Sequence, residues 1–184
     1  MCRFLVMLFV MCASVAFAGE GDERGDHGSD QRHAPMVYDA QGGVVGPLED
    51  YMGASGVFLE IEGSPVFVQV NHRRVGPSVY SASQFEWVGY MEVPYASSDC
   101  SGAVFVADTG SPIPAMAVRE GVDVTLYIAG KVSSVDAHVG SFRYTDTSGA
   151  TSCAALPLET QDLWVVKTAY RLTQHYPEPL RIGF

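Results

Sequence analysis

The stretch VFLEIEGSPVFVQV, residues 57–70, decides the fold class of this chain. Apolar residues recur at every second position on both sides of its centre. They are Val57, Leu59 and Ile61 before it, and Val66, Val68 and Val70 after it. Period-two alternation is typical of strands with one buried face, and glycine and proline favour a turn between them. The stretch therefore predicts a β-hairpin with Glu62–Pro65 as its connection.

The same period continues on both sides of this hairpin. MVYDAQGGVVG (36–46) predicts strand, turn and strand, with Asp39 and Gly42 at the first and fourth positions of a type I turn. Further strands are predicted over 85–95, 103–107, 122–129 and 141–145, and PLRIGF (179–184) predicts a packed terminal strand. The inward-facing set is Phe85, Trp87, Met91, Val93 and Tyr95 in the first of these, and Val122, Val124, Leu126 and Ile128 in the third.

Residues 158–174, LETQDLWVVKTAYRLTQ, fit either a helix or a strand. Helical spacing gathers only Leu163, Val166 and Tyr170 on one side. Strand spacing gathers a fuller set rich in β-formers, namely Trp164, Val166, Thr168, Tyr170 and Leu172, so we predict a strand. Together with 19 glycines and 10 prolines, the pattern predicts a single all-β domain over 36–184. Its expected architecture is an antiparallel sandwich or a partly closed barrel.

Residues 1–18 have the pattern of a signal peptide. Arg3 precedes an apolar run, and Ala16-Phe17-Ala18 fits a signal-peptidase site. Met11 before Cys12 argues against lipid attachment at that cysteine. Residues 19–35 are charged and glycine-rich without large apolar side chains, so we expect a disordered leader. The protein is therefore expected to be periplasmic or extracellular.

Cleavage after Ala18 would leave two cysteines, Cys100 and Cys153. In an oxidising compartment, one intramolecular disulfide between them is expected. A metal or redox site is the alternative, but the chain has no CxxC and no histidine close to either cysteine in sequence. No metal site and no cofactor are predicted.

The expected mature chain is strongly acidic. It would keep 21 acidic residues and, without Arg3, 10 of the 11 basic residues, so its net charge would be 10 − 21 = −11. This balance argues against nucleic acids and anionic membrane surfaces as partners, because phosphates are bound by clustered Lys and Arg. No segment after residue 18 is apolar enough to span a membrane.

Three stretches resemble a group of uncharacterised exported proteins of Gram-negative bacteria: VYDAQGGVVGP (37–47), YASSDCSGAVFV (95–106) and YPEPLRIGF (176–184). The group has a signal peptide, a D-x-x-G-x-x-V-G hairpin and a Y-x-S-x-D-C-S/T-G turn. The resemblance implies an exported β-rich domain with a disulfide at the D-C-S-G turn. It implies no activity.

VFVADTGS, residues 104–111, resembles the catalytic-aspartate motif of pepsin-like and retroviral proteases in its Asp-Thr-Gly-Ser tetrapeptide. Such an enzyme pairs two carboxylates, so a chain with one motif must dimerise through Asp108. It also needs a downstream apolar-apolar-Gly support, and Ile128-Ala129-Gly130 follows too closely. Asp108 is therefore predicted to end a strand before a turn, with no catalytic role. Ser101 is likewise predicted to be a turn residue and not a nucleophile.

The predicted function is that of an exported, non-catalytic binding, envelope or surface module. The alternative is a dimeric aspartic protease that uses Asp108. Tyrosines could form a face for a protein or glycan partner, although ordinary sheet tyrosines are the preferred interpretation. They are Tyr38, Tyr51, Tyr80, Tyr90, Tyr95 and Tyr176. The oligomeric state stays open.

Overall fold

β-Strands form almost all the regular structure of the computed structural model, which describes residues 34–107 and 109–184 without the side chains of 133–135, 158 and 159. The strands are β1 (Met36–Tyr38), β2 (Val44–Pro47), β3 (Glu49–Tyr51), β4 (Ala54–Ile61), β5 (Ser64–Gly76), β6 (Val79–Trp87), β7 (Glu92–Tyr95), β8 (Phe105–Val106), β9 (Ala115–Glu120), β10 (Asp123–Thr145), β11 (Thr151–Arg171) and β12 (Arg181–Gly183). One short helix, α1 (Leu172–His175), precedes β12. The predicted signal peptide, most of the predicted leader and Asp108 lie outside the described residues.

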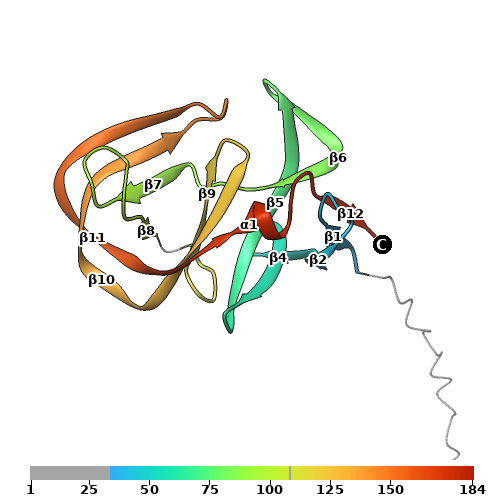
Figure 1. Cartoon of the computed structure of the whole chain (residues 1–184), viewed down its shortest axis with the longest axis horizontal. Helices are drawn as coiled ribbons and strands as arrows, with labels where there is room; N and C mark the ends of the chain where they lie inside the picture. The colour runs from blue at the N-terminus through green and yellow to red at the C-terminus, as the bar shows by residue number, and fades with distance from the viewer. Residues whose placement is uncertain (1–33, 108) are drawn as a thin grey trace, which may run out of the picture. The chain divides into compact units, whose positions relative to one another are not determined.

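The strands pair antiparallel in three sheets (Figure 1). The first has the order β12-β1-β2, and the second has the order β3-β4-β5-β6. In the third, β7-β10-β11-β8 follow one another and β9 also pairs with β10. The sheets do not close into a barrel, so the all-β antiparallel prediction is confirmed in its open form.

The hairpin at residues 57–70 is confirmed, with a shorter connection than predicted. Val57 pairs with Val68 and Leu59 with Val66. The turn consists of Glu62 and Gly63, at φ 51° and 72°, so Ser64 already belongs to β5. Two positive φ angles match the twist of a tight hairpin, which explains the shorter turn.

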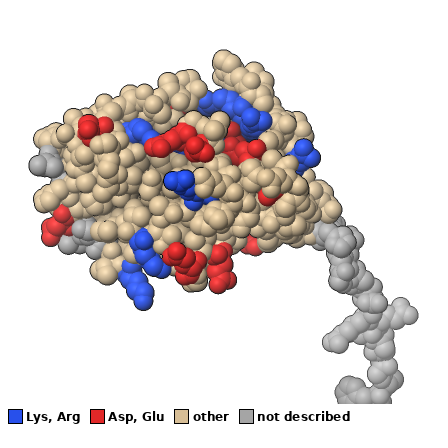
Figure 2. All heavy atoms as spheres, viewed as in Figure 1, with Lys and Arg blue, Asp and Glu red and all other residues tan. Residues whose placement is uncertain are grey.

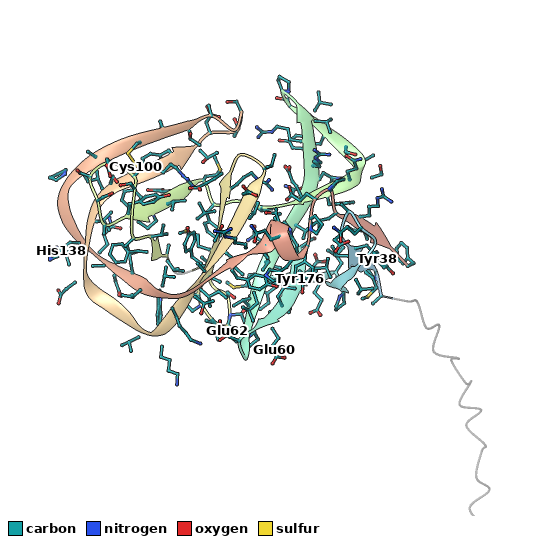
Figure 3. The ribbon with its side chains drawn as sticks, in the orientation of Figure 1. Tyr38, Glu60, Glu62, Cys100, His138 and Tyr176 are labelled. Carbon is teal, nitrogen blue, oxygen red and sulfur yellow. A yellow bond between two sulfur atoms is a disulfide. The ribbon has the colours of Figure 1, made fainter. Side chains whose placement is uncertain are left out.

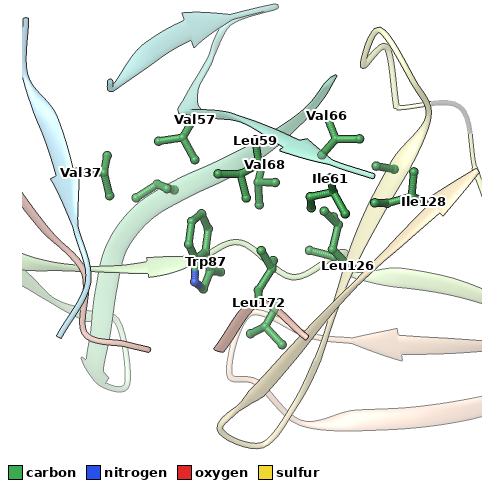
Figure 4. Close-up of a cluster of buried hydrophobic side chains, with 14 of the residues drawn as sticks. Val37, Val57, Leu59, Ile61, Val66, Val68, Trp87, Leu126, Ile128 and Leu172 are labelled. Atoms are coloured by element: carbon green, nitrogen blue, oxygen red, sulfur yellow. The ribbon is translucent and has the colours of Figure 1, made fainter. Parts of the chain in front are cut away.

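The alternating aliphatic side chains of this hairpin lie in the main hydrophobic core (Figure 4). Trp87 of β6 and Leu172 of α1 are completely buried beside them. The third sheet contributes Leu126 and Ile128 of β10 to the same core. Side chains from sequence positions far apart thus share one apolar interior, which stabilises the domain through burial.

The strand predicted over 85–95 is wrong in extent, because the chain passes from one sheet to another within it. β6 ends at Trp87, and β7 begins at Glu92 in a different sheet. Between them, the Val88 amide donates to the Gln69 carbonyl and the Tyr90 amide to the Ala117 carbonyl. These bonds to two different strands end the alternation. Met91, predicted to face inward, is 54% exposed.

The segments 122–129 and 141–145 are parts of one strand, β10, and not two strands. Register shifts along its pairing with β11 bend the ladder where the sequence pattern is interrupted. Val122 was expected to face inward, but it lies in the turn between β9 and β10 and is 82% exposed. The strand predicted over 103–107 shortens to β8, whose partner is β11.

Residues 158–171 belong to β11, so the strand prediction is confirmed there, and the chain turns into α1 at Leu172. The terminal strand is confirmed as well, because β12 pairs with β1 from Met36–Gly183 to Tyr38–Arg181. The turn predicted after β1 is also present, with Asp39 and Gly42 at its first and fourth positions. The Gly42 amide donates to the Asp39 carbonyl, and Asp39 Oδ1 accepts from the Gln41 and Gly43 amides, each at 2.8 Å.

The predicted disulfide between Cys100 and Cys153 is confirmed. Cys100 lies in the loop between β7 and β8 (Figure 3), and Cys153 lies on β11. The Cys100 amide donates to Ser141 Oγ at 2.8 Å, and that hydroxyl donates to the Ser97 carbonyl. The loop is therefore fixed to the third sheet both covalently and by a buried serine. The disulfide is consistent with an oxidising, extracytoplasmic compartment.

Candidate functional site

A hollow of about 360 Å³, hereafter the cleft, lies between the β5–β6 hairpin and the loop that joins β10 to β11. The first wall carries Asn71, His72, Arg74, Tyr80 and Glu86, and the second carries Thr145, Asp146, Thr147 and Gly149. Trp87, Val88, Gly89, Tyr90, Met91 and Arg119 complete the lining. Its size and its mixture of aromatic and polar side chains are typical of ligand sites.

Arg74 brings the two walls together. Its backbone amide donates to Glu86 Oε1 at 3.2 Å, which places both side chains on the β5–β6 hairpin beside the cleft. A Cβ on Gly149 would lie 3.5 Å from a guanidinium nitrogen of Arg74. The absence of a side chain at Gly149 therefore leaves this end of the cleft open.

The second wall is a preformed loop built on Asp146. Its carboxylate accepts from the Ser148 amide at 2.7 Å, from the Ala150 amide at 3.0 Å and from the Ser148 hydroxyl. These hydrogen bonds, the one from Ser148 first, lower the pKa of Asp146 below its usual value. The loop therefore presents a negative charge at neutral pH in a fixed position.

An ion pair between Arg119 and Glu178 lies at the floor of the cleft. The Arg119 guanidinium donates to both oxygens of Glu178, at 2.6 and 3.0 Å, and to the Trp87 carbonyl at 2.7 Å. The Trp87 amide donates to Glu178 Oε1 at 2.6 Å, and the Trp87 indole donates to the Tyr176 carbonyl at 3.2 Å. This clamp, formed by Trp87, Arg119 and Glu178, joins β6, β9 and the segment before β12. Its geometry is the bidentate one that arginine makes best.

Gly89 permits the clamp. A Cβ at this position would lie 2.9 Å from the Cβ of Arg119 and 3.3 Å from its backbone nitrogen. Because β9 passes so close to the chain between β6 and β7, only glycine fits there without displacement. The clamp and Gly89 together fix β6 and β9 beside each other, which pre-organises the floor of the cleft and the wall formed by β6.

His72 has a positioning contact on the first wall. Its ring stacks on Phe85 with centroids 4.4 Å apart, and its Nδ1 donates to the Ser81 carbonyl at 2.8 Å. This bond leaves Nε2 as the ring atom available to a ligand. The arrangement suits a hydrogen-bond acceptor or donor at the rim of the cleft.

The residues that follow Asp108 make structural contacts, while Asp108 itself lies outside the described residues. The Thr109 hydroxyl donates to the Ala115 carbonyl at 3.1 Å, and Ser111 Oγ accepts from the Phe67 amide at 3.2 Å. The Gly110 carbonyl accepts from the Tyr51 hydroxyl at 3.0 Å. The residues after Asp108 therefore join the turn to β3 and β5.

The six tyrosines considered for a binding face do not share one surface. Tyr95 is 4% exposed, and Tyr51 packs against Phe58 and Phe67 with ring centroids 5.2 Å away in each case. Tyr176 lies beside Trp87, near α1, and Tyr38 lies near the β12 end of the chain (Figure 3). Only Tyr80 and Tyr90 line the cleft, and Tyr80 is 53% exposed.

Ser101 lies in a hydrogen-bonded turn, as predicted from sequence. Its hydroxyl donates to Asp99 Oδ1 at 2.6 Å, and its amide donates to Ser97 Oγ at 3.0 Å. Hydrogen bonds to Asp99 from the Ser101 side chain, first, and from the Ser97 side chain lower the pKa of Asp99.

Sequence reasoning missed the clamp and most of the cleft. Glu178 and Arg119 are 59 residues apart, so no local pattern joins them. One signal was present: Arg119 follows the buried run Ala115–Val118, and a charge at the end of such a strand requires a partner.

Among the described residues, no group of three or more His, Cys, Asp or Glu side chains is arranged to hold a metal ion. The same part of the chain contains no helix of the length and hydrophobicity needed to cross a membrane. Comparisons with protein-family models, with curated proteins and with solved structures find no match to this chain.

Proposed function

We propose that this chain is an exported, non-catalytic β domain that binds a ligand in the cleft. The observation that supports this most is the construction of the cleft. Two hairpins from different sheets face one another across a hollow of about 360 Å³, and a half-buried ion pair lies at its floor. Pre-organised sites of this kind bind with little loss of conformational freedom.

Export is supported by three features that agree with one another. Residues 1–18 have the signal-peptide pattern, the disulfide joins Cys100 to Cys153, and the sequence resembles exported proteins of Gram-negative bacteria. A binding role, as opposed to a catalytic one, is supported by the cleft itself. Its lining combines polar and aromatic side chains. The turn after Asp108, the residue of the alternative protease, is joined to β3 and β5 by structural hydrogen bonds.

The proposal is tested with the carbohydrate, protein and lipid fractions of a bacterial envelope extract. The immobilised wild-type domain is compared with Arg74→Ala and Tyr80→Ala, which remove one half-buried and one exposed side chain, respectively, from the cleft wall. Val122→Ser is the matched control, because Val122 is 82% exposed in the β9–β10 turn and does not line the cleft. We expect one fraction to bind the wild type and the control equally and the two cleft variants at least about tenfold more weakly. Equal binding by all four proteins, or binding by none, would refute the proposal.

A further inference from the structure

The cleft is the first of three adjoining hollows, which together we call the groove. The second, of about 430 Å³, shares Met91, Thr145 and Asp146 with the cleft. The third, of about 530 Å³, shares Glu92 and Tyr144 with the second. Because neighbouring hollows have residues in common, the groove is longer than any single hollow. Such a shape fits an extended chain better than a compact small molecule.

Aromatic side chains are distributed along the groove. Tyr80 stands in the cleft at 53% exposure, and Tyr144 stands between the second and third hollows at 38% exposure. Phe142 lines the third hollow with its ring centroid 6.1 Å from that of Tyr144, but it is only 8% exposed and belongs to a buried cluster, so Tyr80 and Tyr144 are the exposed rings. Exposed aromatic faces at intervals stack on the C–H faces of successive sugar rings. They provide apolar contact area with little loss of side-chain entropy.

Planar polar side chains also line the three hollows. Asn71 and Glu86 line the cleft, Glu92 lies where the second and third hollows meet, and Gln161 lines the third hollow. Glu86 Oε1 accepts from the Arg74 amide and Asn71 Oδ1 accepts from the His72 amide, so the second oxygen of Glu86 and the amide nitrogen of Asn71 are the atoms that can bond a sugar hydroxyl. Aromatic and planar polar side chains in one groove are the complement of a chain of sugars.

The charge of the groove disfavours a polyanion. Its lining carries three carboxylates, Glu86, Glu92 and Asp146, against two guanidinium groups, that of Arg74 and that of Arg119, which is paired with Glu178. Acidic and basic residues are intermixed on the face shown in Figure 2, and no continuous basic surface runs across it. Phosphate or sulfate chains would meet more carboxylates than cations in this lining.

An extended peptide is also a poor fit. Peptides in grooves of β-proteins commonly add a strand to an open sheet edge. Two edge strands line the groove. β6 exchanges two backbone hydrogen bonds with Leu180 at Phe85, and β7 pairs with β10 on one edge while Tyr95 bridges Val104 on the other. Pro94, in the middle of β7, has no amide hydrogen to donate. β7 therefore offers no continuous edge for a peptide.

We propose that the groove binds a linear, uncharged oligosaccharide of several units, with Tyr80 and Tyr144 as stacking platforms. This inference rests on the proposed function and names its ligand class. The expected signature is a dependence of affinity on chain length, because additional sugar units reach additional hollows.

The experiment uses an array of linear neutral oligosaccharides of one to ten units, with matched compact branched glycans and with extended uncharged peptides. Hits of each length are then titrated calorimetrically against the wild type, Tyr80→Ala, Tyr144→Ala and the control Val122→Ser. We expect affinity to rise with length up to several units, and Tyr144→Ala to weaken the longer chains about tenfold while leaving the shortest unchanged. Val122→Ser should bind like the wild type.

Three results would overturn the inference. Binding of peptides or compact glycans alone, with loss in Tyr80→Ala, would leave the proposed function standing but make the ligand class wrong. Affinity that is independent of chain length would also make it wrong. No binding to the array, together with no binding to any envelope fraction, would refute both proposals.

Discussion

Removal of the Glu178 side chain should destabilise the domain because it leaves the Arg119 guanidinium without its anion. Glu178 is 13% exposed and accepts hydrogen bonds from Arg119 at 2.6 and 3.0 Å and from the Trp87 amide at 2.6 Å. Loss of one partner from a buried charge pair costs about 3–5 kcal/mol. Since Arg119 is 26% exposed, solvent screens part of this cost. We therefore expect Glu178→Ala to lower the free energy of unfolding by about 2–3 kcal/mol. For a chain of this size, that corresponds to a fall in Tm of about 4–12 °C.

The assay is thermal unfolding by circular dichroism, with urea unfolding as a second measure of the free energy. Glu60→Ala is the matched control, because Glu60 is exposed on β4, and it should change stability by less than about 0.5 kcal/mol. Arg119→Met with Glu178→Leu should be less destabilising than either single change, because neither charge is then left unpaired. If the Tm of Glu178→Ala lies within 2 °C of that of the wild type, the clamp does not stabilise the fold. The same conclusion follows if the double variant loses as much free energy of unfolding as the two single variants together.

Three further predictions follow from the structure. Cys100→Ala, Cys153→Ala and the double variant should each lower the free energy of unfolding by the same amount, up to about 4 kcal/mol, because each removes the same cross-link across 53 residues. Unequal losses among the three variants in urea unfolding would contradict this. Burial, followed by the nearby Tyr176, raises the pKa of Tyr170 to about 12 from 10.0, so folding favours the neutral ring. The stabilisation from the neutral ring should be complete below about pH 10 and should fall as the pH rises towards 12, and this fall should be smaller in Tyr170→Phe. Absorbance at 295 nm follows the ionisation of the ring, and alkaline unfolding measures the loss of stability. An alkaline unfolding transition that is the same in Tyr170→Phe as in the wild type would argue against the prediction. Asp108→Asn should fold with stability changed by less than about 1 kcal/mol, and neither it nor the wild type should cleave peptides between pH 3 and 6; cleavage that both the substitution and a transition-state-analogue inhibitor abolish would establish the protease instead.

The alternation of apolar and polar residues was sufficient to predict the hairpins, because each hairpin depends on residues close in sequence. Val57, Leu59 and Val68 face the core as their spacing predicts. The disulfide could be predicted because only two cysteines follow the signal-peptide pattern.

Strand ends could not be predicted where tertiary contacts set them. β6 stops at Trp87 because the next amides bond to Gln69 and Ala117, which belong to different sheets. Val122 has the right spacing for a buried position but lies in a tight turn after Gly121, at φ 64°. Spacing alone cannot distinguish the last residue of a strand from the turn beyond it.

The cleft escaped prediction for the same reason. Arg74 and Gly149 become neighbours only when two sheets assemble, and Arg119 meets Glu178 only through the segment before β12. The tyrosine count pointed to a binding face, but contacts with core residues account for Tyr51 and Tyr176.

Hydrogen–deuterium exchange tests the central claim, a ligand site in the cleft, most directly. The domain is measured with and without soluble envelope extract, peptide by peptide. We predict slower exchange of residues 71–80 and 144–152 in the presence of extract, with no change in residues 36–47 of β1 and β2. Protection confined to other segments, or no protection anywhere, would contradict a ligand site between the two hairpins.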